Sequence, residues 1–236
     1  MNMVDFAIIG LIALSVLWGL YRGFIQSVLS SGACILSFVL SFMLYPTVAG
    51  WFQGDQSIVM NLFHYTADAA VRVGGDLASI NVTQLTGETI SRVIENAKLP
   101  APLGTLLQHN LENKVFSAFN IQSVSDYVNQ TILTFSINVL SFLICFAVIF
   151  IVLSIVINLL RAVFHYPLLK QFDWLLGGAF GALRGIILCY AGFVIMPFIV
   201  TIIPFEGFNT LIAQSNLAKI FSNGNLIMSI MNRRLF

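Results

Sequence analysis

The residues of this chain that could do chemistry are few, and two arginines in a repeated motif stand out. The motif Gly-x-x-Arg-Gly occurs at residues 19–23, where it contains Arg22, and again at residues 181–185, where it contains Arg184. Arg184 falls inside a long apolar stretch, where a guanidinium group costs free energy unless partners or water compensate it. Such a group suits an ion or solute path through a membrane. It also suits a structural contact, or an arginine whose side chain reaches back to the membrane boundary.

Two carboxylates and a serine complete the set of candidate functional residues. Asp173 begins the last apolar stretch and would lie at the same boundary as Arg22, with which it could pair. Asp5 lies near the start of the first stretch, where the helix dipole favours a negative charge. Ser37 belongs to a small, mildly polar stripe on the second stretch, which suits either helix packing or a wet surface opposite Arg184. The stripe consists of Ser30, Cys34, Ser37 and Ser41.

Glycine spacing indicates where helices approach each other closely. Glycines four residues apart remove side chains from one helix face, so that another backbone can come near. Five glycines of this kind flank the two arginines: Gly19, Gly23, Gly177, Gly181 and Gly185. We therefore assign these five glycines to helix packing, with the polar residues setting the register of the helices.

The sequence lacks the patterns of familiar enzymes and cofactor sites. Its three histidines are scattered and its three cysteines lie within apolar stretches, which predicts neither a metal site nor a disulfide. No metalloprotease, nucleophile-elbow or phosphate-loop motif is present, and no apolar stretch carries paired carboxylates. A net charge of +1 provides no basic surface for nucleic acid. We expect no catalysis, no cofactor and no nucleic-acid partner.

Four apolar stretches are long enough to span a membrane as helices. The chain is 58% hydrophobic and 9% charged, whereas soluble proteins carry about 25% charged residues. A spanning helix needs about 20 apolar residues, and lipid offers no water to unpaired backbone groups. The candidate spans are residues 4–21, 24–44, 132–160 and 174–203. Short connections within each pair predict two hairpins, so the expected fold is an all-α membrane protein with four transmembrane helices.

The remaining sequence divides the chain into four parts. Residues 46–130 are polar and acidic, and periodic apolar positions predict short amphipathic helices at 89–98 and 105–119, broken at Pro100 and Pro102. The C-terminal tail has an amphipathic pattern with a basic end, which is typical of an interfacial helix. The predicted parts are residues 1–45 as the first hairpin, 46–130 as the insert, 131–204 as the second hairpin and 205–236 as the tail.

Basic residues in short loops predict the orientation. Arg22, Arg161 and Lys170 lie in the two short loops, which favours these loops in the cytosol. Both termini and the 46–130 insert would then be extracytoplasmic. Basic residues near the C-terminus, such as Lys219, argue for the opposite orientation.

Two motifs resemble signatures of one known family. Residues 4–9 (Val-Asp-Phe-Ala-Ile-Ile), followed by residues 21–24 (Tyr-Arg-Gly-Phe), resemble the opening of the colicin V production protein family of bacterial inner-membrane proteins. Residues 172–177 (Phe-Asp-Trp-Leu-Leu-Gly), followed by residues 181–185 (Gly-Ala-Leu-Arg-Gly), resemble the second signature of that family. The segment between the second and third spans is longer than in compact members.

The resemblance implies a multi-pass protein of the bacterial inner membrane. It would be accessory to toxin or bacteriocin production or secretion, and to envelope homeostasis. Its partners would be the lipid bilayer, further copies of itself in a homo-oligomer, or other membrane and secretion proteins. The alternative is a small ion or solute channel or transporter with a path near Arg184.

Overall fold

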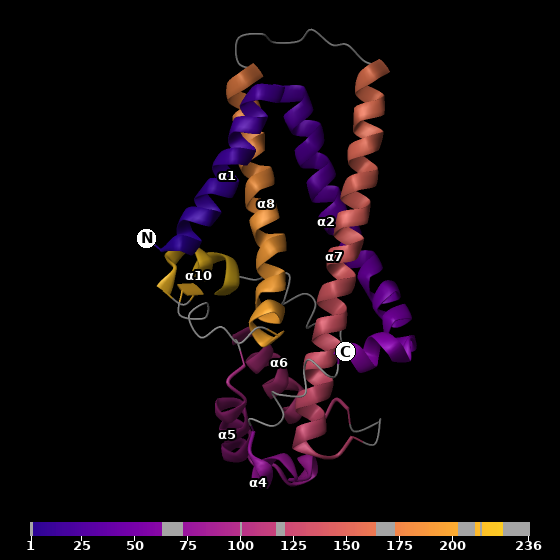
Figure 1. Cartoon of the computed structure of the whole chain (residues 1–236), viewed down its shortest axis with the longest axis vertical. Helices are drawn as coiled ribbons and strands as arrows, with labels where there is room; N and C mark the ends of the chain where they lie inside the picture. Colours follow the sequence, from indigo (N-terminus) through magenta and orange to yellow (C-terminus); the bar gives the residue numbers. More distant parts are fainter. Residues whose placement is uncertain are drawn as a thin grey trace. The chain divides into compact units, whose positions relative to one another are not determined.

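The described part of the chain is helical throughout, apart from turns and one isolated β-bridge (Figure 1). The computed structural model describes residues 2–62, 73–99, 101–116, 121–163, 173–202, 211–212 and 214–223. Its elements are α1 (Met3–Arg22), α2 (Phe24–Gly54), α4 (Gly75–Ala78), η1 (Val82–Gln84), α5 (Gly87–Ala97), α6 (Ala101–Glu112), α7 (Val124–Val163), α8 (Asp173–Ile202) and α10 (Asn216–Asn223). Four of them, α1, α2, α7 and α8, are long and apolar enough to cross a membrane. The all-α class and the four candidate spans are confirmed.

Two of the four long helices extend beyond the apolar stretches that predicted them. α2 passes through Pro46 and ends at Gly54, and α7 begins at Val124, before the apolar run starts at residue 132. A proline inside a helix removes one backbone hydrogen bond and crowds the preceding turn. In membrane helices, neighbouring groups can re-satisfy the freed backbone. Hydropathy therefore identified where these helices are apolar and not where they end.

The chain divides into two compact units. Unit 1 comprises Met1–Val48, Ser141–Ile195 and Glu206–Ile227, and unit 2 comprises Ala49–Leu140, Met196–Phe205 and Met228–Phe236. Both α2 and α7 contribute residues to each unit.

Aromatic and small side chains from three helices form the core of unit 1. Cys34 of α2, Phe146 of α7 and Ala191 of α8 make one buried cluster. Phe38 of α2 meets the edge of Phe142 on α7, with ring centroids 5.6 Å apart. Edge-to-face aromatic pairs of this kind add a directional contact to the apolar burial.

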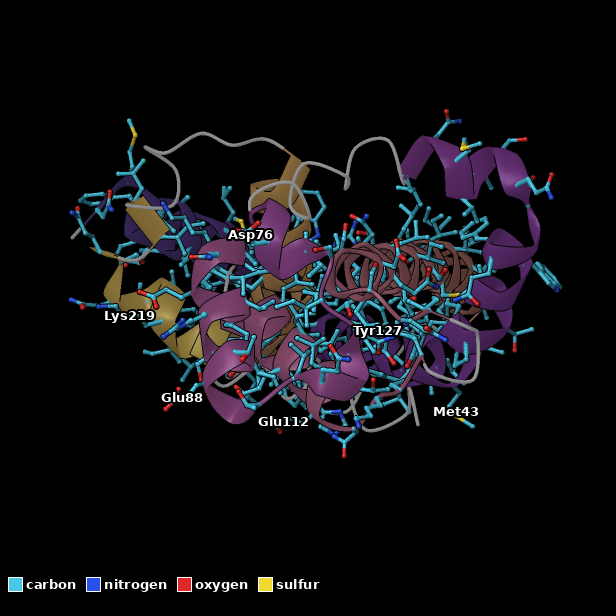
Figure 2. The ribbon with its side chains drawn as sticks, turned by 90° about the horizontal axis from the view of Figure 1, so that it is seen from below. Met43, Asp76, Glu88, Glu112, Tyr127 and Lys219 are labelled. Atoms are coloured by element: carbon cyan, nitrogen blue, oxygen red, sulfur yellow. The ribbon has the colours of Figure 1, made fainter. Side chains whose placement is uncertain are left out.

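Amphipathic helices form much of unit 2. α5 buries Ile90, Val93 and Ala97, which belong to the stripe that the sequence predicted, and leaves Glu88 exposed. In Figure 2, Glu88 and Glu112 lie at the outside, whereas Tyr127 of α7 lies in the interior.

The second amphipathic helix is displaced from its predicted position. α6 runs from Ala101 to Glu112, whereas the prediction covered 105–119, of which residues 117–119 lie outside the described residues. Pro102 lies in its first turn, where backbone N–H groups have no partner within the helix and proline is tolerated. The predicted break between the two helices is present, because α5 ends at Ala97.

Candidate functional site

α1 and α8 cross so closely that backbone meets backbone (Figure 1, indigo and orange). A Cβ atom added to Gly19 would come closer than 3.0 Å to the carbonyl oxygen of Gly177, a separation that real Cβ atoms essentially never show. A Cβ on Gly181 would lie 2.5 Å from the carbonyl oxygen of Ser15. We call this contact the glycine seam; it consists of Gly19 on α1 and Gly177, Gly181 and Gly185 on α8. Side chains at these positions would hold the helices apart.

Sequence reasoning missed one further glycine beside the seam. A Cβ on Gly178 would lie 2.7 Å from Cδ2 of Leu20. Because that neighbour is the end of a flexible side chain and not backbone, the contact is less restrictive than the seam. The tandem Gly177-Gly178 was the available signal in the sequence.

Gly23 is the single non-helical residue between α1 and α2, and Asp173 of α8 lies directly against it. Gly23 has φ 80° and ψ 173°, a backbone region that is essentially restricted to glycine. The backbone N–H of Phe24 donates a hydrogen bond of 2.7 Å to Oδ1 of Asp173. Asp173 therefore caps the N-terminus of α2, although it belongs to the first turn of another helix.

Arg22 does not form the predicted ion pair with Asp173, although the structure describes both residues. Its guanidinium carbon lies 4.8 Å from the ring centroid of Trp18 on the preceding turn of α1. A guanidinium group over an indole ring makes a favourable cation–π contact. The carboxylate of Asp173 instead accepts a hydrogen bond from the backbone N–H at the start of α2.

Arg184 projects from α8 toward α1 and α2. Its Nε donates to Oγ of Ser15 at 3.2 Å, and its Nη1 donates to Oγ of Ser30 at 2.9 Å. Ser15 in turn donates its hydroxyl proton to the carbonyl oxygen of Gly181 at 2.7 Å. Ser15 lies about two helical turns, or roughly 10 Å, before Arg22 along α1. The guanidinium group therefore contacts hydroxyl groups within the helix bundle and is not held at the level of Arg22.

The other serines of α2 are bonded to backbone carbonyl groups. Ser27 donates to Gly19 of α1 at 3.1 Å, and Ser31 donates to Phe180 of α8 at 2.7 Å. Ser37 bonds to Ala33 within its own helix at 2.7 Å, and is not brought to Arg184. These hydroxyl groups tie α2 to its neighbours or to itself.

Asp5 is buried, with 2% of its surface exposed, at the opposite end of α1 from Arg22. It accepts hydrogen bonds from the backbone N–H of Asn2 at 2.8 Å, from the hydroxyl of Ser215 at 2.5 Å and from the backbone N–H of Leu217 at 3.1 Å. The Asn2 contact belongs to a capping box at the start of α1. The other two contacts cap α10, so the carboxylate of Asp5 links the N-terminal ends of α1 and α10.

The docking of α10 was not predicted from sequence. The aromatic ring of Phe221 packs against Tyr190 and Phe193 of α8, with ring centroids 4.9 and 5.6 Å apart. Ser215 stands immediately before the helix, and a serine at that position is a typical N-cap. That local signal marked a helix start, but it did not identify Asp5 as its partner.

Replacing Asp5 with alanine is expected to loosen α10 from α1. The loss of a cap costs about 0.5–2 kcal/mol per helix, and 1 kcal/mol changes an opening equilibrium roughly fivefold. Lys219 is an exposed residue of α10 and provides a tryptic site. We expect cleavage there to become about fivefold faster in Asp5→Ala and to stay unchanged in Asp126→Ala, which removes an exposed carboxylate. Equal cleavage rates in wild type and Asp5→Ala would show that Asp5 does not hold α10.

Comparison with known proteins assigns the chain to a family. The sequence profile described as colicin V production protein matches residues 4–106 and 115–225, which include all the residues of the glycine seam. A protein from Haemophilus influenzae, described as a colicin V production protein homolog, is 41% identical over 56 residues; the match covers 24% of this chain and 34% of the relative. The chain thus spans about a third of that relative. No solved structure matches the chain. With its four apolar helices, this multi-pass membrane protein belongs to the colicin V production protein family.

Proposed function

We propose that the protein is a non-enzymatic accessory of bacteriocin production or secretion in the bacterial inner membrane. In this proposal it also supports envelope homeostasis, and it acts by assembling with itself or with other membrane proteins. Family membership and the name of the Haemophilus influenzae relative support the link to colicin V production.

The observation that carries the proposal is that polar side chains of unit 1 form hydrogen bonds between helices. Asp173 caps α2, Asp5 caps α10, and Arg184 bonds to serines of α1 and α2. Each of these side chains joins two or more helices around the glycine seam. This pattern supports a rigid membrane scaffold whose lipid-exposed surfaces meet partners.

Exposed apolar side chains supply such surfaces. On α1 they include Leu14 and Leu17, and on α7 they include Ile151 and Ile155. Lipid or the helices of a partner can cover them, because both are apolar.

In our proposed topology the four helices form two hairpins, with both short loops in the cytosol. The contact between Gly23 and Asp173 supports it, because it brings the α1–α2 turn and the start of α8 to one level. The termini and the 46–130 insert would then be extracytoplasmic. The cysteine of Glu88→Cys should react with a membrane-impermeant thiol reagent added from outside, whereas the three buried native cysteines should not. Reaction of this cysteine only after permeabilisation would contradict this orientation.

A complementation assay tests the accessory role. We expect the wild-type protein to restore toxin release in a colicin V-producing host that lacks its own family member. Gly181→Ala should fail, because its Cβ would meet the backbone of Ser15, whereas Gly192→Ala should succeed, because nothing lies within 4 Å of that position on the same helix. Membrane levels of both variants are compared by immunoblot. Wild-type release no better than an empty vector would refute the proposal.

The alternative function is a channel or transporter with a path near Arg184. Its support is a guanidinium group that bonds to neutral hydroxyl groups inside the bundle. Reconstitution in liposomes separates the two functions. Flux that is lost in Arg184→Leu while the oligomeric state is unchanged would establish the path, and absence of flux from the wild-type protein across a range of ions and solutes would support the accessory role.

A further inference from the structure

Within the described residues, no carboxylate pairs with the guanidinium group of Arg184. The nearest acid of the same helix, Asp173, is engaged by the N–H of Phe24. Arg22, the arginine of the other Gly-x-x-Arg-Gly motif, carries the same charge as Arg184 and cannot neutralise it. A cation in this position is costly in lipid. An anion bound at Arg184 would neutralise this uncompensated positive charge.

Ser30 can donate a hydrogen bond to such an anion. Its oxygen accepts from Nη1 of Arg184 at 2.9 Å. Other serines of this region donate to carbonyl groups, as Ser27 and Ser31 do. The proton of Ser30 has no acceptor among the residues that the structure describes. A hydroxyl group beside a guanidinium group, with its proton unused, is suited to an oxyanion.

Gln26 supplies an independent observation. Its side chain is only 7% exposed, and its Oε1 atom is buried without a hydrogen-bond partner among the described residues. Gln26 and Ser30 are four residues apart on α2, so they are neighbours on one helix face. The oxygen and nitrogen of a glutamine amide are nearly identical in shape. Rotating the amide would therefore give the helix face that carries Ser30 a buried NH₂ donor in place of the unpartnered oxygen.

The surroundings indicate that the site lies within about one helical turn of the membrane boundary. Arg184 is partly exposed. Trp18 and Trp174 are 51% and 58% exposed, and tryptophan is enriched at membrane interfaces. Ser15, which contacts Arg184, lies about one helical turn from Trp18 on α1. Arg22, stacked on Trp18, adds a second positive charge on the side of the loop.

We infer that Arg184, Ser30 and Gln26 form a binding site for a phosphate oxyanion, with Arg22 as an outer cation. The phosphodiester of an anionic phospholipid and a free phosphate ion share this chemistry. Arg184 forms the charge-assisted hydrogen bonds, which are stronger than neutral ones. Ser30 and Gln26 donate the neutral bonds. This inference goes beyond the proposed accessory function and does not depend on it.

Ligand-dependent thermal unfolding of the purified full-length protein tests the inference. Cys34, Cys145 and Cys189 are free and buried, so their reaction with a thiol-reactive dye reports unfolding. A ligand that binds the folded state raises the unfolding midpoint in a concentration-dependent way. The probes are phosphatidylglycerol in detergent micelles, diacylglycerol as the same lipid without phosphate, and inorganic phosphate with chloride as its ionic-strength control.

Phosphatidylglycerol should raise the midpoint of the wild-type protein, and diacylglycerol should not. Stabilisation by the lipid alone identifies a headgroup as the ligand, and stabilisation by inorganic phosphate as well identifies the free ion as a sufficient one. Arg184→Gln should weaken the apparent affinity about tenfold or more, as expected for a charged hydrogen bond. Lys219→Gln removes an exposed cation on α10 and should leave the affinity unchanged.

Two results would overturn the inference. The first is a wild-type protein that neither phosphatidylglycerol nor inorganic phosphate stabilises. The second is an affinity that Arg184→Gln leaves unchanged. If Arg184→Gln does not fold, Gln26→Leu replaces it: this variant keeps both arginines and should bind several-fold more weakly, and an unchanged affinity would equally exclude the site.

Discussion

Gly19→Ala is expected to lower the thermal unfolding midpoint of the protein by roughly 2–12 °C. The added Cβ would collide with the carbonyl oxygen of Gly177 and would lie 3.0 Å from Cα of Gly181. Both neighbours are backbone, so α1 and α8 must move apart as whole helices. Overpacking of this kind costs about 1–3 kcal/mol, and each kcal/mol lowers the midpoint by about 2–4 °C in a protein of this size. The reaction of the buried cysteines with a thiol dye measures the change.

Gly10→Ala is the matched control for this prediction. Gly10 belongs to the same helix, and nothing lies within 4 Å of a Cβ built on it. Alanine is a better helix former than glycine by about 1 kcal/mol, so the midpoint should stay constant or rise. Equal destabilisation by both substitutions would show that the loss comes from the helix itself and not from the seam.

Gly23→Ala is expected to be similarly destabilising, for two separate reasons. At φ 80° and ψ 173° any residue other than glycine is strained, at a cost of about 1–3 kcal/mol. In addition, the new Cβ would collide with Oδ2 of Asp173. The start of α2 would then lose its cap, because Asp173 must move away from the N–H of Phe24. The same dye assay measures the unfolding midpoint.

A double substitution separates the two causes. Asp173→Ala alone should cost about 0.5–2 kcal/mol as a lost cap. In the double variant Gly23→Ala with Asp173→Ala the collision is absent, and only the backbone strain and the lost cap remain. The double variant should therefore lose less stability than the sum of the losses of the two single variants. Gly32→Ala serves as the control on α2, since its Cβ would meet nothing within 4 Å. A Gly23→Ala protein as stable as Gly32→Ala would contradict the strained turn.

Local sequence properties were sufficient to identify the spans and the close contact. Apolar length predicted α1 and α8 to within one or two residues, because lipid requires every backbone group to be paired inside a helix. The glycine spacing likewise placed Gly19 and Gly181 on faces that another backbone could approach, and the structure brings both to the seam. Periodicity also located the buried face of α5.

The ends of the helices could not be predicted from apolar length alone. The apolar run predicted a second span over residues 24–44, but α2 continues through Pro46 to Gly54. The buried side chains of Ala49, Leu133 and Ile137, with Phe52 packed against them, hold that extension within unit 2. Tertiary packing thus overrides the helix-breaking tendency of a single proline.

The sequence by itself determined that four apolar helices exist, which of their faces lack side chains, and which few polar residues lie among them. Only the tertiary structure decided the partners of those polar residues. Asp5 bonds to Ser215, Asp173 to the N–H of Phe24, and Arg184 to Ser15 and Ser30. The physical reason is the distance along the chain over which each effect acts. Apolar length and glycine spacing act within one helix, whereas a hydrogen bond depends on which distant segment the folded chain brings within about 3 Å.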